Sequence, residues 1–256
     1  MRNPAALSTR NGESQPRRAS GARWPRGTLP AVTIAVVVVV LAAAVLGATV
    51  LPDGRLVWRA AIVAVVAGGL LLWLTAQHLA AASFGAANLV TLGRGVLTVL
   101  LLALLGAPAS AGLSWLVVVL AIVAVALDGV DGTLARSRNE ASDFGARFDM
   151  ETDALLILVL AALVWQLDKA GAWILLAGLL RYLFVAASYA VSWLARPLPP
   201  SRRRQTVCVL QIVSLIGALV PFVLSPWSTS LALVGLLLLA WSFAVDVAWL
   251  ARRARV

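Results

Sequence analysis

One stretch decides the fold of this chain. It reads Asp128-Gly-Val-Asp131-Gly132-Thr-Leu-Ala135-Arg136, then eight further residues, then Gly145-Ala-Arg-Phe-Asp149-Met-Glu-Thr-Asp153. The stretch joins the end of one long apolar run to the start of the next. Carboxylates at membrane depth are costly, so they normally face the protein interior and pair with cations or with each other. The pattern therefore predicts two membrane helices that bring four aspartates to a common polar site.

The spacing of these residues puts them on matching helix faces. At about 100° per residue, the group from Asp128 to Arg136 lies on one half of its helix. Gly145, Asp149 and Asp153 are four residues apart, so they share one face of the next helix. A turn at residues 138–142 would fold the two faces together.

Converging carboxylates repel one another unless a cation lies between them. A site with oxygen ligands alone favours Mg²⁺ or Mn²⁺ over zinc. Gly132, Ala135 and Gly145 leave space beside the metals, and the planar guanidinium of Arg136 suits a phosphate. The residues therefore indicate metals with a bound pyrophosphate, although a structural polar cluster or an ion-transport site also accounts for carboxylates at this depth.

The full spacing D-x2-D-G-x2-A-R-x8-G-x3-D-x3-D resembles the signature of the CDP-alcohol phosphatidyltransferases, and the resemblance extends from about Asn88 to the C-terminus. It implies transfer of a phosphatidyl group from CDP-diacylglycerol to an alcohol, with release of CMP. Asp153 would be the general base, and Gly132 and Arg136 would contact the nucleotide and phosphates. Two divalent cations, Mg²⁺ or Mn²⁺, would be held by four aspartates: Asp128, Asp131, Asp149 and Asp153.

The segment Asn88-Leu-Val-Thr91-Leu-Gly-Arg94 resembles the one that precedes the aspartate signature in this family and helps to bind the CDP group there. The resemblance assigns Asn88 and Thr91 to substrate binding. A helix cap at Asn88, with Thr91 bonded to the backbone, is the structural alternative. Ser142 also has two interpretations, because it can cap the following helix and stands where the family contacts the nucleotide.

The composition is that of a membrane protein with several spans. Of the 256 residues, 61% are apolar and only 12% are charged, which is far from the balance of a soluble domain. The net charge of +10 clusters beside the apolar runs. This placement favours anionic lipid headgroups over nucleic acid as the partner of the charge. The single cysteine, Cys208, excludes an internal disulfide.

Apolar runs of about twenty residues are long enough to cross a bilayer, and they predict an all-α integral membrane protein with about eight transmembrane helices. Residues 1–30 are rich in arginine and lack apolar periodicity, so we expect a disordered basic tail, with a signal peptide as the competing interpretation. Residues 31–76 would form an N-terminal transmembrane hairpin, and residues 77–256 the six-helix core. The spans are expected at residues 31–51, 56–76, 88–106, 112–136, 142–167, 172–194, 206–224 and 227–250.

The distribution of basic residues predicts the orientation. With the N-terminus inside, the tail, the signature arginines and the C-terminal arginines fall on the cytoplasmic side, whereas Arg55, Arg59 and Lys169 fall outside. The aspartates then lie at the cytoplasmic face. A chain rich in Ala, Val and Arg with one Lys indicates a GC-rich genome, and we expect a bacterial cell membrane.

Several other polar residues have open roles. Arg181, in the middle of a span, needs a polar partner, either one of the aspartates or an acceptor phosphate. Arg181-Tyr182 stands where relatives that use glycerol phosphate often carry Arg-Glu. The prolines from Pro197 onward predict a loop that includes Arg202–Arg204, which either mark topology or gather an anionic headgroup. Gln211 and Asp246 are expected to bond between helices.

The resemblance leaves the acceptor open. Glycerol 3-phosphate and inositol phosphate are the first candidates, because Arg181 and Arg202–Arg204 could bind a phosphate. Phosphatidylglycerol, as in cardiolipin synthesis, is the alternative, and assembly as a homodimer is a further expectation. The rival hypothesis from another class is a cation transporter that uses the intramembrane aspartates.

Overall fold

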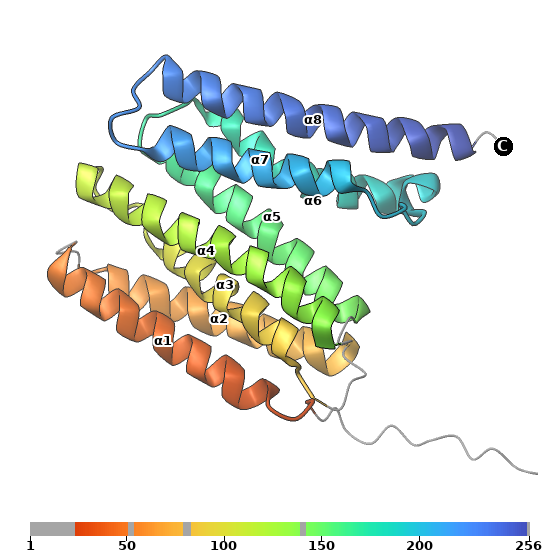
Figure 1. The fold of residues 1–256 in the computed structure, drawn as a ribbon. Helices are drawn as coiled ribbons and strands as arrows, with labels where there is room; N and C mark the ends of the chain where they lie inside the picture. Colours follow the sequence, from red (N-terminus) through yellow and green to blue (C-terminus); the bar gives the residue numbers. More distant parts are fainter. Residues whose placement is uncertain (1–23, 51–53, 79–82, 139–141, 255–256) are drawn as a thin grey trace, which may run out of the picture.

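A computed structural model describes residues 24–50, 54–78, 83–138 and 142–254. Within these ranges, the side chains of His78, of residues 129–138 and of Asp143 lie outside the description. The described chain is all-helical, which confirms the predicted fold class, and it contains eight α-helices (Figure 1). Their bounds are α1 (Thr28–Thr49), α2 (Leu56–His78), α3 (Ala86–Ala103), α4 (Ala111–Arg138), α5 (Asp143–Gln166), α6 (Leu176–Ala190), α7 (Arg202–Leu219) and α8 (Trp227–Ala254).

Six helices of the described chain are long and apolar enough to cross a membrane: α1, α2, α3, α4 as far as Asp128, α6 together with the 3₁₀ turn η1 (Ala172–Leu175), and α8. The protein is therefore an integral membrane protein. The other two helices are α5 and α7, and each has charged residues in its first turns. Asp149, Glu151 and Asp153 stand in α5, and Arg202–Arg204 open α7.

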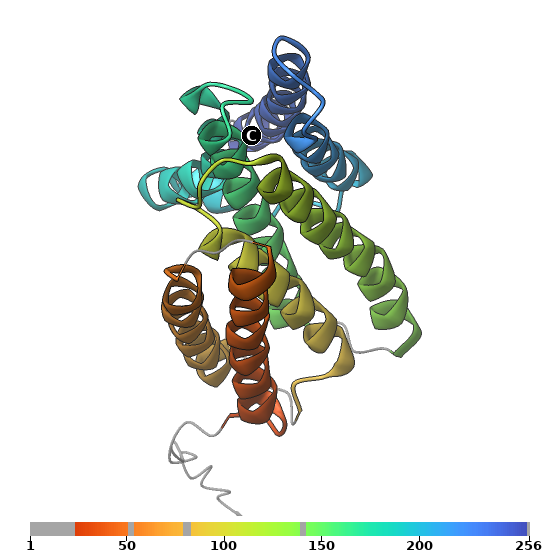
Figure 2. The same ribbon diagram turned by 90° about the vertical axis from the view of Figure 1, so that its left-hand side faces the viewer.

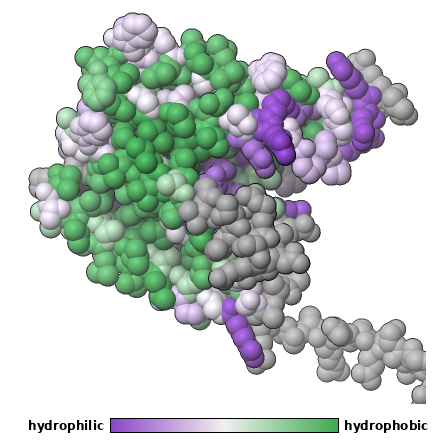
Figure 3. Space-filling model, in the orientation of Figure 1, coloured by the Kyte–Doolittle hydropathy of each residue, from purple (hydrophilic) through white to green (hydrophobic). Residues whose placement is uncertain are grey.

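The surface has the polarity of a protein embedded in lipid. Large apolar side chains are exposed along the spans, among them Ile34, Leu41, Val66 and Leu237. Apolar surface covers most of the face in Figure 3, whereas hydrophilic side chains gather toward the end where α8 terminates. A bilayer would cover the apolar part, since exposed apolar area of this extent is not sustained in water.

Two helices occupy the middle of the bundle. α3 packs on α1, α2, α4 and α5, and α5 packs on α3, α6, α7 and η1. The hairpin α1–α2 lies on one side of this pair, and the α7–α8 pair lies on the other (Figures 1 and 2). α4 packs mainly on α3 and α7. Residues on α4 and α5 therefore meet beside α3.

Local sequence explains where several helices begin and end. The Ser142 hydroxyl caps α5 by accepting the Gly145 N–H at 3.0 Å, which confirms its predicted capping role. Gly106, just past the end of α3, has φ +78°, a conformation that glycine adopts without steric cost. Gly178 on α6 lies directly against the backbone of Leu158 on α5, where a side chain would collide.

Two predicted boundaries shift. α7 begins at Arg202, so the prediction of a loop through Arg202–Arg204 is wrong for these three residues. The prolines end at Pro200, and arginine is a good helix former, so nothing after Ser201 opposes the helix. α1 begins at Thr28, inside the range 1–30 predicted as a tail. Residues 1–23 of that range lie outside the described residues.

The end of the bundle away from the aspartates is tied by hydrogen bonds. The Lys169 ammonium donates to the carbonyl oxygens of Val220, Pro221 and Val223 at 2.8–3.2 Å. The Lys169 carbonyl in turn accepts the Ser228 hydroxyl at 2.8 Å. Lys169 is 8% exposed. It bonds backbone carbonyls of the turn that follows α7, and so joins the turn after α5 to the turn before α8.

We predict that Lys169→Met destabilises the protein by about 2–3 kcal/mol, because buried carbonyls lose a charged donor. Thermal unfolding in detergent, followed by tryptophan fluorescence, measures the effect. Asp168→Asn is the matched control, since Asp168 is exposed and Asn tolerates its φ of +52°. Equal unfolding temperatures for Lys169→Met and the control would contradict this role.

Candidate active site

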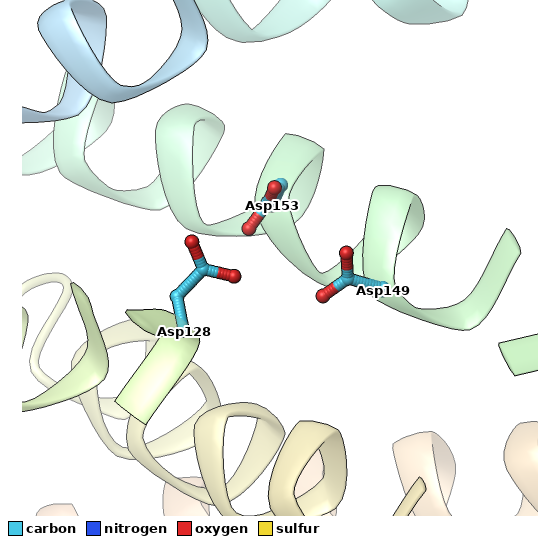
Figure 4. A group of neighbouring side chains, drawn as sticks. All are labelled: Asp128, Asp149 and Asp153. Atoms are coloured by element: carbon cyan, nitrogen blue, oxygen red, sulfur yellow. The ribbon is translucent and has the colours of Figure 1, made fainter. Parts of the chain in front are cut away.

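Three of the four predicted aspartates converge at one point of the bundle. Asp128 near the end of α4 faces Asp149 and Asp153 on α5 (Figure 4). One carboxylate oxygen from each residue lies within 4.8 Å of the others. The side chains are 23–42% exposed, so the group remains accessible from outside the protein. Asp131 is one turn further along α4, but its side chain lies outside the described residues.

Arg94 on α3 supplies the counter-charge for these carboxylates. Its Nη1 lies 2.7 Å from Asp128 and also pairs with Asp149, and its Nη2 pairs with Asp153. The Arg94 side chain is only 2% exposed. A buried guanidinium at membrane depth requires such partners. Arg94 is thus the hub that joins α3, α4 and α5.

The carboxylates fit a divalent metal. All three offer oxygen atoms, which hard cations such as Mg²⁺ prefer. The guanidinium that pairs with them is buried, whereas the carboxylates themselves are partly exposed and accessible to a cation. Arg94 shows that the group already accepts a positive charge from α3. The three side chains present therefore suit a metal centre of the kind the sequence predicts.

Arg94 belongs to a buried polar stripe along α3. Asn88, Thr91, Arg94 and Thr98 are 6%, 2%, 1% and 0% exposed. The Asn88 amide donates to the Phe84 carbonyl at 2.5 Å, and Thr91 donates to the backbone at 3.2 Å. The N-cap of α3 is Gly85, so the interpretation of Asn88 as the cap is wrong.

Gly145 lets α3 and α5 approach beside this stripe. A Cβ at Gly145 would lie 3.0 Å from Asn88 Oδ1 and 3.1 Å from Ser142 Oγ. The structure therefore brings Asn88, Ser142 and Gly145 together at the start of α5, one turn before Asp149. A Cβ here would be tight against two side-chain oxygens, so the contact favours glycine at this position of the signature.

A model of the CDP-alcohol phosphatidyltransferase family matches residues 84–248. The chain belongs to the CDP-alcohol phosphatidyltransferase family. No curated protein and no solved structure gives a significant match. The family match covers α3 to most of α8 and begins after the hairpin α1–α2. The protein is thus an enzyme of phosphatidyl transfer from a CDP-alcohol, and the transporter hypothesis is not supported.

Helix α7 also contacts the phosphatidyltransferase site, in addition to α3, α4 and α5. Cys208 Sγ lies 3.9 Å from Asp153 Oδ2. Asp153 has the least exposed side chain of the three carboxylates, at 23%. The sequence gives no signal for this contact, because it depends on how α7 packs on α5. Asp153 is therefore enclosed by α3, α5 and α7.

The structure does not bring Arg181 to the aspartates. Arg181 pairs with Glu151, and its Nη1 lies 2.9 Å from Met150 Sδ. Glu151 is two residues from Asp149, about 200° around α5, and it therefore faces away from the metal centre. Neither predicted alternative for Arg181, an aspartate partner or an acceptor phosphate, corresponds to its observed partner.

The remaining polar candidates lie at the α7–α8 contact. Arg203 pairs with Asp246 and donates to the Ser242 hydroxyl at 2.7 Å, which confirms that Asp246 bonds between helices. Gln211 is fully buried, and its amide has no hydrogen-bond partner among the described residues. Its predicted bond between helices is not observed. Gly132 and Arg136 belong to α4, and their surroundings lie outside the description.

We predict that Arg94→Met lowers the stability of the metal-free protein by about 3–5 kcal/mol, because it leaves buried carboxylates without a counter-charge. Arg252→Met changes an exposed arginine in the last turn of α8 and should cost less than about 1 kcal/mol. Thermal unfolding of both variants in detergent with EDTA makes the comparison. Similar losses for the two variants would show that Arg94 is no more important to the fold than a surface arginine.

Proposed function

We propose that the protein transfers a phosphatidyl group from CDP-diacylglycerol to a small phosphorylated alcohol, glycerol 3-phosphate or inositol phosphate, and releases CMP. The observation that carries the proposal is the convergence of the partly exposed Asp128, Asp149 and Asp153 in a membrane-embedded family member. A lipid donor reaches such a site with its chains in the bilayer. Its charged pyrophosphate then lies at the polar end of the helices.

The reaction exchanges one phosphorus–oxygen bond for another. The acceptor hydroxyl oxygen bonds to the phosphorus of the phosphatidyl group, and the bond from that phosphorus to the CMP oxygen breaks. Asp153 takes the proton of the acceptor hydroxyl as general base. Its contacts with Arg94 on α3 and Cys208 on α7 support this role, since they hold the carboxylate in one position. The proposed products are a phospholipid and CMP.

Two divalent cations, Mg²⁺ or Mn²⁺, would be held by Asp128, Asp131, Asp149 and Asp153. When bound, they neutralise the pyrophosphate and stabilise the charge of the leaving CMP. Arg94 keeps three of these carboxylates in register from the buried side. The proposed contacts for the donor are Asn88, Thr91, Gly132, Arg136 and Ser142.

The start of α7 supports a phosphorylated acceptor. Arg202 is exposed, and it forms no ion pair with the described residues. The first turn of a helix attracts anions through its free N–H groups and its dipole. Arg202 precedes Cys208 by six residues, about 9 Å along the helix, and Cys208 touches Asp153. A phosphate at this helix start would therefore lie on the helix that contacts the base.

We propose that the site faces the cytoplasm. The basic residues Arg196, Arg202–Arg204 and Arg252 lie at the end that carries the aspartates, and hydrophilic surface gathers there in Figure 3. Basic residues are enriched on the cytoplasmic side of membrane proteins. The expected location is a bacterial cell membrane, with anionic lipids beside these arginines and with a homodimer as the proposed assembly.

The first prediction from this function is CMP release by purified protein in nanodiscs supplied with CDP-diacylglycerol, Mg²⁺ or Mn²⁺, and one acceptor at a time. We expect release with glycerol 3-phosphate or inositol phosphate. EDTA should abolish it because the metals are removed, and Asp153→Asn should abolish it because the base is absent. Release with phosphatidylglycerol alone would replace the proposed acceptor with a lipid. Full activity of Asp153→Asn would refute its role as base.

The second prediction concerns the acceptor. Arg202→Ala should raise the KM for the phosphorylated acceptor about tenfold, the worth of one charge-assisted hydrogen bond, and leave the KM for CDP-diacylglycerol unchanged. Arg252→Ala, an exposed arginine in the last turn of α8, is the matched control. A rise in both KM values, or in neither, would remove the start of α7 from the acceptor site.

A further inference from the structure

A cavity of about 120 Å³ lies between the N-terminal hairpin and the catalytic core. Its walls come from α1 and α2 on one side and from α3 and α5 on the other. The hairpin precedes the part of the chain that matches the family, which begins at residue 84. The cavity therefore exists because this chain places two additional helices against the core.

The chemistry of the cavity selects hydrocarbon. Its wall is made almost wholly of apolar side chains and glycines. The hydroxyls of Thr98 and Thr152 also line it, but they donate to the backbone of their own helices at 2.9 and 2.8 Å. Water needs polar partners in a cavity, and an apolar cavity of about 150 Å³ in another protein stays dry and binds benzene.

The depth of the cavity matches an acyl chain. Its wall on α1 runs from Val32 to Val39, about 6–17 Å from the start of the helix at 1.5 Å per residue. Half of the hydrocarbon core of a bilayer is about 15 Å thick. The cavity is partly open to the surroundings, and beside these spans the surroundings are lipid. A chain from the nearer leaflet reaches this depth.

The chain in the cavity is separate from the reacting donor. Gly95 and Val99 line the cavity, whereas Arg94 on the same helix turns to the aspartates. Most of the cavity's lining on α3 (Leu92, Gly95, Val96 and Val99) lies about 100–160° around the helix from Arg94, and Thr98 lies about 40° from it. The cavity and the site where the donor phosphates would bind therefore lie mainly on different faces of α3.

We propose that the cavity binds one acyl chain of a bilayer phospholipid, which packs the hairpin α1–α2 onto α3 and α5. Association of helices within lipid depends on close packing, since burial of apolar surface gives no advantage there. An unfilled gap loses those contacts, and a bound chain restores them. The lipid would thus support the two helices that carry Arg94, Asp149 and Asp153.

The test uses the full chain in phosphatidylcholine–phosphatidylglycerol nanodiscs that contain phosphatidylcholine with a diazirine in the middle of one chain. After irradiation, mass spectrometry compares labelling at Val36, which lines the cavity, with labelling at Val37, which is 49% exposed to the bilayer. We expect strong labelling at Val36. Gly95→Leu should abolish it, because a side chain at Gly95 meets open space and would fill the cavity.

Ala35→Leu fills the cavity from the opposite wall and should have the same effect without touching α3. The matched control is Gly69→Leu on α2, where a side chain also meets open space but outside the cavity. It should keep the labelling at Val36. Labelling that is absent at Val36 in the unmodified protein, that persists in both filled variants, or that excess CDP-diacylglycerol displaces would overturn the proposal.

Discussion

The ion pairs of Arg94 with Asp128, Asp149 and Asp153 are the interaction on which the rest of the structure depends. A guanidinium buried at membrane depth is unstable without carboxylates, and carboxylates gathered at one point are unstable without a cation. Each group therefore makes the other tolerable in an apolar bundle. Removing either one leaves a charge that no other described side chain neutralises at this point.

This constraint fixes the arrangement of the central helices. Arg94 has to reach aspartates on two helices, so α3 must lie beside both α4 and α5. A small residue at Gly145 is then favoured, because α5 meets Asn88 at its first turn. The contact of Cys208 with Asp153 places α7 on the same centre. A few polar contacts thus select one packing among the many that apolar helices permit.

The helices could be predicted from sequence because apolar runs and breakers are local signals, and so could the aspartate faces, which depend on helical period. The partners of the charged side chains could not be predicted in this way. Arg94 belongs to the Asn88–Arg94 segment, but its partners could not be predicted from that segment. The contacts require α3 to lie beside α4 and α5, which follow it in the chain. Arg181 pairs with Glu151 rather than with an aspartate, because α6 packs on the side of α5 that carries Glu151. Spacing along one helix identifies a face, but packing decides which faces meet.

The two ends of the bundle are held by different forces, and this difference suits catalysis. Away from the site, Lys169 and the Gln166 amide tie helix ends through short-range hydrogen bonds to backbone. At the site, α3, α4 and α5 are held by charges on partly exposed carboxylates. A cation or a pyrophosphate interacts directly with these charges, whereas the backbone hydrogen bonds at the far end involve no group that the substrate would contact. The substrate therefore meets the same charges that hold the central helices together.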